Sequence, residues 1–195
     1  MTDRTPEQLA DLLADTYDAF TAHVTGLAPA GLEQPTRAPA WNVRQLLFHQ
    51  LLDAQRALVA LATPASGEPD VDDVTYWRPF LPSGGGDDAA HARFVVAVAD
   101  AYDGPRGLLA QWTATAGAAG HAARAADPEG RIATQGHVLT VPDFVSTLLV
   151  EATIHLLDAH GAPPPAAVAH TRRVLEAIDG EPLPPGSDAE VVRLR

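Results

Sequence analysis

The chain has 195 residues, of which 46% are hydrophobic, and a formal net charge of −12 at pH 7. This length and composition fit one domain with a sizeable core, and the acidity argues against binding to nucleic acid or to an anionic membrane. The absence of cysteine excludes a disulfide framework, a thiolate zinc site and a cysteine nucleophile, so any thiol chemistry needs a thiol from a cofactor or substrate.

Targeting and membrane signals are not evident in the sequence. Residues 1–7 contain no apolar signal core, and no run approaches the roughly 18 apolar residues that span a membrane. We therefore expect a cytoplasmic protein, either a monomer or a homodimer, without a nucleic-acid or membrane partner.

Helical periodicity, start signals and breakers divide the chain into predicted helices. These helices span residues 6–27, 42–62, 87–103, 106–126, 141–160 and 166–178. The first begins at a capping box of Thr5 and Gln8, and the second at one of Asn42 and Gln45. Gly161 is expected to end the fifth helix as a left-handed cap.

The segments between these helices are rich in proline, glycine and aspartate. Residues 28–40 predict a loop, residues 64–86 a long connection with one short helix, and residues 127–139 a loop or short hairpin. Four long amphipathic helices with few strand signals favour an all-α protein, most simply a four-helix bundle with additional short helices. We expect the bundle to cover residues 1–180, and residues 181–195 to form an extended C-terminal tail.

A carboxylate and a histidine lie four residues apart in the fifth predicted helix. Glu151 and His155 share one helical face with Phe144 and Leu148, so the pair points into the bundle. Buried polar groups need partners, and a metal ion is one such partner. The inward stripe favours a pair of ligands, and a surface ion pair is the alternative.

His49 adds a second histidine, on the second predicted helix. Two histidines and one carboxylate suit a catalytic zinc with an open fourth position, and bundle cores commonly bind metals through side chains of facing helices. His49, Glu151 and His155 are therefore the candidate metal ligands. Asp53 and Asp158 are candidates to orient the ligand imidazoles from outside, with a helix-surface carboxylate as the alternative.

Further side chains are candidates for a substrate or cofactor site. His137 lies in the loop just before the helix of the predicted ligands and can reach the pocket from there. Trp77 belongs to a short aromatic group whose alternative role is core packing. Arg44, Arg56 and Arg78 are candidates to bind a polar group, with a surface role as the alternative for each, and the sequence gives no basis for choosing among them. The remaining histidines are weaker candidates, expected near helix ends (His91, His121, His160) or on the surface (His23, His170).

Two sequence blocks resemble those of a known family. Residues 41–49, Trp-Asn-Val-Arg-Gln-Leu-Leu-Phe-His, resemble the family pattern of Trp, Thr or Ser, Val, Arg-Asp-Leu and then His, and residues 139–158 resemble its second block. Residues 171–180 resemble a segment that follows the second block in many members. The family is that of the mycothiol-dependent maleylpyruvate isomerase-like proteins, within the DinB-like superfamily, and the similarity spans roughly residues 9–180.

The resemblance implies a DinB-like four-helix bundle whose metal ligands correspond to His49, Glu151 and His155. It also implies zinc as the metal and mycothiol, a cysteine-containing sugar conjugate, as the cosubstrate, which suits a chain without cysteine. The isomerase that names the family carries a further C-terminal domain, whereas residues 161–195 alone follow the predicted metal helix here. Thiol transfer is therefore a more general expectation than maleylpyruvate isomerisation.

The leading functional hypothesis is a zinc-dependent S-transferase or thiol-assisted isomerase, in which the metal holds the cosubstrate thiol as thiolate for attack on a small electrophile. Metal-assisted hydrolysis by zinc-bound hydroxide is one alternative. A non-catalytic bundle that binds a metal or a small molecule is another. Thiol dependence separates the two enzymatic hypotheses, and metal content separates a metal-binding bundle from a structural one.

Overall fold

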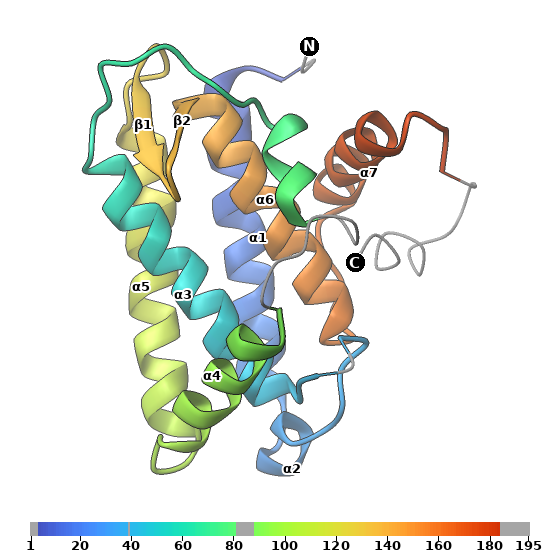
Figure 1. The fold of residues 1–195 in the computed structure, drawn as a ribbon. Coiled ribbons are helices and arrows are strands. Elements are labelled where there is room, and N and C mark those ends of the chain that lie inside the picture. Colours follow the sequence, from blue (N-terminus) through green and yellow to red (C-terminus); the bar gives the residue numbers. More distant parts are fainter. Residues whose placement is uncertain (1–3, 39, 81–87, 184–195) are drawn as a thin grey trace.

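The computed structural model describes residues 4–38, 40–80 and 88–183 of the chain. Within these residues the fold is helical apart from one two-stranded hairpin, which confirms the predicted all-α bundle (Figure 1). Four long helices build the bundle: α1 (Pro6–Gly26), α3 (Val43–Leu61), α5 (Pro105–Ala125) and α6 (Val141–Asp158).

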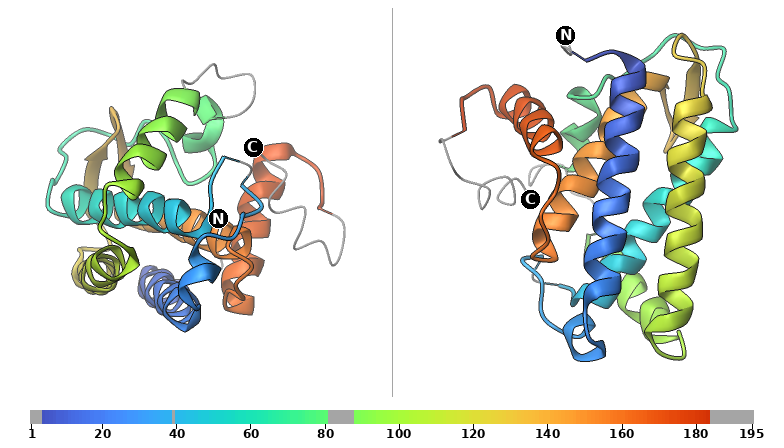
Figure 2. Two further views of the ribbon diagram at one scale, coloured as in Figure 1. Left: turned by 90° about the horizontal axis from the view of Figure 1, so that it is seen from below. Right: turned by 180° about the vertical axis from the view of Figure 1, so that it is seen from behind.

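The four long helices pack as a closed ring of neighbours, and the left view of Figure 2 looks along two of them, α1 and α5. α1 packs against α5 and α6, and α3 packs against the same two helices. Trp112 of α5 fills the space beside α1, with its ring 5.6 Å from that of Tyr17 and 5.2 Å from that of Phe20. Its Nε1 donates to the Thr21 hydroxyl at 2.9 Å. The buried aromatic rings thus supply apolar burial while the indole N–H keeps a partner.

Side-chain caps mark the start of three of the four long helices, α1, α3 and α6. The predicted capping boxes of α1 and α3 are both present. At α6 the Thr140 hydroxyl accepts a hydrogen bond from the backbone N–H of Asp143 at 3.1 Å. Each cap satisfies a backbone donor that the first helical turn leaves without a partner, which is typically worth about 1 kcal/mol.

Shorter elements connect and flank the bundle. They are α2 (Pro29–Leu32), the 3₁₀ helix η1 (Thr75–Phe80), α4 (Asp88–Asp100), β1 (Arg131–Thr134), β2 (His137–Thr140) and α7 (Pro165–Asp179). The two strands are antiparallel and turn at Gln135 and Gly136, whose φ angles are +48° and +82°. Positive φ at both central residues is what a type I′ hairpin turn requires. Residues 127–139 therefore contain the hairpin rather than a plain loop.

Some predicted boundaries are wrong. The segment 28–40 contains α2, whose 4 residues are too few to show helical periodicity, and α4 ends at Asp100 instead of residue 103. The left-handed residue after α6 is His160, at φ +64°, and not Gly161. Gly161 is needed for close packing instead, because a Cβ atom there would overlap the Leu156 side chain.

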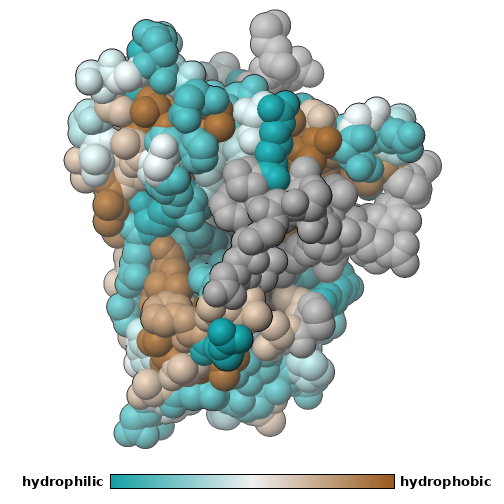
Figure 3. All heavy atoms as spheres, in the orientation of Figure 1, coloured by the Kyte–Doolittle hydropathy of each residue, from teal (hydrophilic) through white to brown (hydrophobic). Residues whose placement is uncertain are grey.

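Three further observations concern membrane spans, the surface and the predicted C-terminal tail. No helix among the described residues is long and apolar enough to cross a membrane. The described surface in Figure 3 mixes hydrophilic and hydrophobic residues. Among the described residues, Phe94 of α4 is an exposed aromatic residue, at 50%. Residues 184–195 of the predicted C-terminal tail lie outside the described residues.

A buried polar network joins α6 and α7 to the segment before η1. The Ser146 hydroxyl donates to Asp73 Oδ2 at 2.8 Å, and the same carboxylate oxygen accepts from Arg173 at 2.8 Å. His170 Nε2 lies 2.7 Å from Ser146 Oγ, and 3% of His170 is exposed. The prediction that His170 lies on the surface is therefore wrong, because a serine of another helix and a loop carboxylate cover it.

The buried position of His170 predicts a dependence of stability on pH. Burial lowers the pKa of His170 to about 4 from an ordinary value of 6.5, and the positive charge of Arg173 adds to this effect. As the pH falls through this window the unfolded chain takes up a proton that the folded chain does not. Folding therefore loses stability from about pH 6.5 down to about pH 4, by at most about 3 kcal/mol from this group.

We expect His170→Gln to flatten the pH dependence of the free energy of unfolding in that window, measured by urea denaturation at a series of pH values. His121 is an exposed histidine on α5 and offers a matched control, since His121→Gln should leave the dependence as it is in the unmodified chain. An identical slope in the unmodified chain and His170→Gln would contradict the assignment.

Candidate metal centre

Two helices of the bundle bring the three predicted ligands together. His49 lies on α3, and Glu151 and His155 lie one turn apart on α6, which packs against α3. One potential ligand atom from each residue lies within 4.8 Å of the other two. The spacing of four places both α6 side chains on one face, so the pairing of two rigid helices sets the geometry.

Two of the distances among these atoms lie on either side of the ligand spacing in a zinc site. Glu151 Oε2 lies 2.9 Å from His155 Nε2 and 3.9 Å from His49 Nε2. Metal–ligand bonds of about 2.0–2.1 Å in a tetrahedral zinc site place the ligand atoms roughly 3.3 Å apart, which lies between these two values. Two imidazole nitrogens and one carboxylate oxygen are also a donor set of catalytic zinc sites that keep a fourth position open.

His155 lies between two carboxylates. Its Nε2 faces Glu151 at 2.9 Å, and its Nδ1 faces Asp158 Oδ2 at 3.1 Å. A neutral imidazole carries one proton and can donate to one of these groups, so the other requires a second proton or a metal ion. The His155 side chain is 2% exposed and the Asp158 side chain 0%. A positive charge at Nε2 therefore offsets buried negative charge.

Glu151 is ionised over the neutral pH range. Desolvation acts to raise the pKa of Glu151, but the hydrogen bonds and positive charge of His155 and His49 outweigh it and hold that pKa well below its usual value. The carboxylate is therefore available as a ligand without first losing a proton.

His49 packs among other aromatic rings. The Trp41 ring lies 4.8 Å from it with 31° between the planes, and the His155 ring meets it edge-on at 4.7 Å. His49 Nδ1 lies 3.2 Å from Nε2 of His91, which belongs to α4. This contact has no local sequence signal, because it arises where α4 docks on α3 through tertiary packing.

A row of polar side chains leads from His49 to the hairpin. Asp53 Oδ2 lies 3.7 Å from His49 Nε2, and Asp53 Oδ1 lies 3.4 Å from Arg56 Nε. Arg56 Nη1 donates to the Tyr76 hydroxyl at 3.2 Å, and that hydroxyl donates to the side-chain oxygen of Gln135. Burial raises the pKa of Tyr76 to about 12, although Arg56 acts in the opposite direction. The hydroxyl therefore stays neutral beside the candidate site.

The other predicted binding residues have their own partners or face solvent. Arg44 forms ion pairs with Glu33 and Asp100, and Arg78 is exposed. Trp77 Nε1 donates to a backbone oxygen of its own segment at 3.0 Å, and a loop carboxylate lies 2.9 Å from His137 Nδ1. The binding roles predicted for Arg78, Trp77 and His137 stay predictions.

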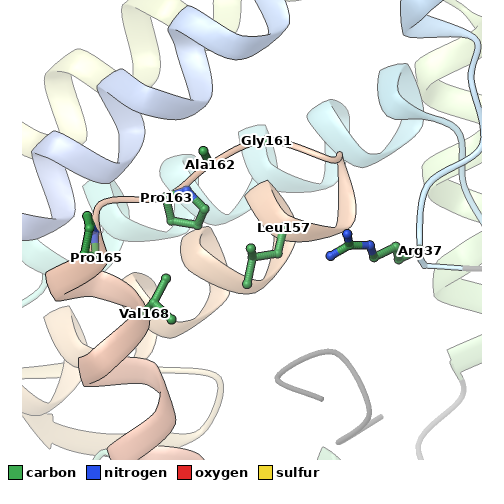
Figure 4. A pocket seen from close by; sticks show the side chains of 7 residues that line it. All are labelled: Arg37, Leu157, Gly161, Ala162, Pro163, Pro165 and Val168. Carbon is green, nitrogen blue, oxygen red and sulfur yellow. The ribbon is translucent and has the colours of Figure 1, made fainter. Parts of the chain in front are cut away.

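A separate cleft lies at the junction of α6 and α7. It has a volume of about 390 Å³ and is lined by Arg37, Leu157, Gly161, Ala162, Pro163, Pro165 and Val168 (Figure 4). Arg37 is the one ionisable group among these described lining residues, and they include no carboxylate or imidazole. The cleft therefore does not offer a metal site, and the ligand cluster lies elsewhere on α3 and α6.

The chain is similar to a described protein family over most of its length. The family model for the mycothiol maleylpyruvate isomerase N-terminal domain matches residues 13–160. This range includes His49, Glu151 and His155. No curated protein and no solved structure matches the chain. The family expected from the two sequence blocks is therefore confirmed.

Removal of a ligand should abolish tight metal binding. We expect His49→Ala and Glu151→Gln each to weaken zinc affinity by more than the roughly 10- to 100-fold that loss of an outer hydrogen-bond partner costs. The measurement is zinc content after purification, followed by competition with a chelator of known affinity.

The matched controls are His121→Ala and Glu129→Gln, which change exposed residues of the same types. Both should keep the affinity of the unmodified chain. Equal zinc affinity in His49→Ala and in the unmodified chain would show that His49 is not a ligand.

Proposed function

Because the chain belongs to the mycothiol maleylpyruvate isomerase N-terminal domain family, we propose that it is a zinc-dependent enzyme that uses the low-molecular-weight thiol mycothiol to modify a small electrophile. One observation carries this proposal, the convergence of ligand atoms from His49, Glu151 and His155 within 4.8 Å. Three protein ligands leave a zinc position for a thiol. Because the chain has no cysteine, the sulfur comes from the cosubstrate.

Bound zinc would supply a thiolate at neutral pH, because a coordinated thiol loses its proton. The part of the protein is to hold and orient the ligands. Asp158 lies at Nδ1 of His155, which favours the proton on that nitrogen, leaves Nε2 for the metal and increases its basicity. Glu151 is ionised before a metal binds, so metal binding does not compete with a proton there.

Both reactions expected of the family follow from a thiolate beside an electrophile. In S-transfer a sulfur–carbon bond forms, the leaving group departs with the electrons of its own bond, and the thiol proton passes to water. In isomerisation the thiol adds to a double bond and later leaves, so it is regenerated. Either reaction needs a polar group that orients the small molecule beside the sulfur.

Arg56 is the cation that we propose for this orienting role. Its guanidinium lies 5.5 Å from the centre of the Phe144 ring, and Asp53 joins it to His49. The hydroxyl of Tyr17 is buried without a hydrogen-bond partner among the described residues, and Arg56 Nε, which faces Asp53 Oδ1 at 3.4 Å, is buried without a well-aligned hydrogen bond among them. Buried donors without partners are uncommon, and these two can donate to an oxygen atom of a bound molecule.

Thiol dependence tests the proposed function. We expect the zinc-loaded chain to consume mycothiol together with at least one of three electrophiles: an activated aryl chloride, an epoxide or an activated alkene. Mass spectrometry of the product measures this reaction. With cobalt in place of zinc, added mycothiol should produce a sulfur-to-metal charge-transfer band. Both signals should be lost in Glu151→Gln.

Two outcomes would contradict thiol chemistry. Turnover that proceeds equally well without mycothiol would indicate metal-assisted hydrolysis. A cobalt spectrum that does not change on addition of mycothiol would show that the metal does not bind the thiol.

Substitution of Arg56 tests the orienting role. We expect Arg56→Met to raise the KM for the electrophile about ten-fold, as for loss of one charge-assisted hydrogen bond, without a change in zinc content. Arg78→Met changes an exposed arginine and is the matched control. Arg56→Met leaves the Asp53 carboxylate without its ion-pair partner and could therefore destabilise the fold. Arg56→Lys keeps the positive charge, and thermal unfolding of each variant measures whether the fold is intact. Unchanged KM in both Arg56 variants would exclude the role.

A further inference from the structure

His49 has a partner that the proposed chemistry does not use, His91 of the neighbouring helix α4. The two imidazoles meet edge-on, with 5.3 Å between ring centroids and 76° between planes, and His91 Nε2 lies 3.2 Å from His49 Nδ1. We propose that His91 accepts a hydrogen bond from Nδ1–H of His49 and is thereby a positioning residue of the metal site. This inference rests on the proposed function, because it concerns how His49 is presented to zinc.

The hydrogen bond selects the form of His49 that can bind a metal. A neutral imidazole carries its proton on one nitrogen and a lone pair on the other. The Nε2 atom of His49 is the one that faces Glu151, at 3.9 Å, so a metal bound there requires the proton on Nδ1. His91 Nε2 lies within hydrogen-bond distance of that proton and so favours this tautomer.

The second histidine of the site has an equivalent acceptor. His155 Nδ1 faces Asp158, three residues further along the same helix. Metal-binding histidines almost always donate their other N–H to such a group, which orients the ring and strengthens the ligand. Asp53 does not take this place for His49, because its carboxylate lies 3.7 Å from Nε2 and so on the metal side of the ring. His91 takes it instead, from a different helix.

Contacts near His91 hold α4 against the site. Trp41 Nε1 donates to the backbone oxygen of Ala92 at 3.4 Å, and the Phe94 ring lies 6.2 Å from that of Phe48 on α3. Trp41 also packs against the imidazole of His91, with 6.1 Å between centroids. His91 itself is exposed, so its substitution removes little apolar burial and tests the hydrogen bond rather than the packing of α4.

Metal affinity of the full chain at one fixed pH tests the proposal, with zinc and cobalt in competition with a chelator. We expect His91→Leu to weaken binding about ten-fold, at the lower end of the range for loss of an outer partner because the residue is exposed. His91→Gln has a side-chain oxygen that can replace Nε2 as acceptor and should restore most of the affinity. Asp158→Asn is the positive comparison, and His121→Leu is the control at an exposed position of α5.

A nitrogen-15 spectrum of the zinc-loaded protein adds a readout that a purely structural role would not change. The Nδ1–H proton of His49 should be protected from exchange in the unmodified chain and in His91→Gln, and lost to rapid exchange in His91→Leu. Equal affinity of His91→Leu and the unmodified chain would overturn the proposal, as would an equal loss in the Leu and Gln variants. An unmodified chain that binds no metal would instead refute the proposed function, so the two failures are distinguishable.

Discussion

The charge balance around His155 is the constraint on which the candidate site depends. Two carboxylates of its own helix, Glu151 and Asp158, lie at its two ring nitrogens, and both His155 and Asp158 are buried. Removing such charges from water without compensation costs several kcal/mol per ion. A cation at Nε2 offsets this cost, and a divalent metal does so while binding His49 as well. Helix α6 thus favours a cation at this position, and α3 supplies the third ligand of the proposed site.

Apolar packing keeps these polar groups in place. Phe144 and Leu148 lie on the same stripe of α6 as Glu151 and His155, two turns and one turn before Glu151, and are 0% and 1% exposed. A rotation of α6 that moved Glu151 away from α3 would expose both, at about 1.5–3 kcal/mol for each side chain. The direction of the ligands therefore follows from the burial of the apolar residues before them.

The features that local chemistry determines could be predicted from the sequence, and those that need a distant partner could not. Capping boxes located the starts of α1 and α3, and the spacing of Glu151 and His155 on an apolar stripe indicated an inward pair. His49 was predicted because it lies on a second capped helix and in a recognisable sequence block. The environments of His91 and His170 were missed, because their hydrogen-bond partners belong to other elements. The sequence around a polar residue on a helix does not show whether a distant segment of the chain covers that residue in the fold.

The family match ends at residue 160, yet residues beyond it shape one wall of the site. Asp73 is held both by Ser146 of α6 and by Arg173 of α7. These bonds fix the segment that leads into η1, and η1 carries the Tyr76 hydroxyl that accepts from Arg56. The segment that carries the hydroxyl partner of Arg56 is thus held in part by α7, which lies outside the matched residues. The proposed metal ligands lie within the residues that the family model matches, whereas the polar wall proposed to meet the small molecule packs in part against a helix beyond those residues. Under the proposed function, changes in α7 are therefore expected to alter the choice of small molecule more than metal binding.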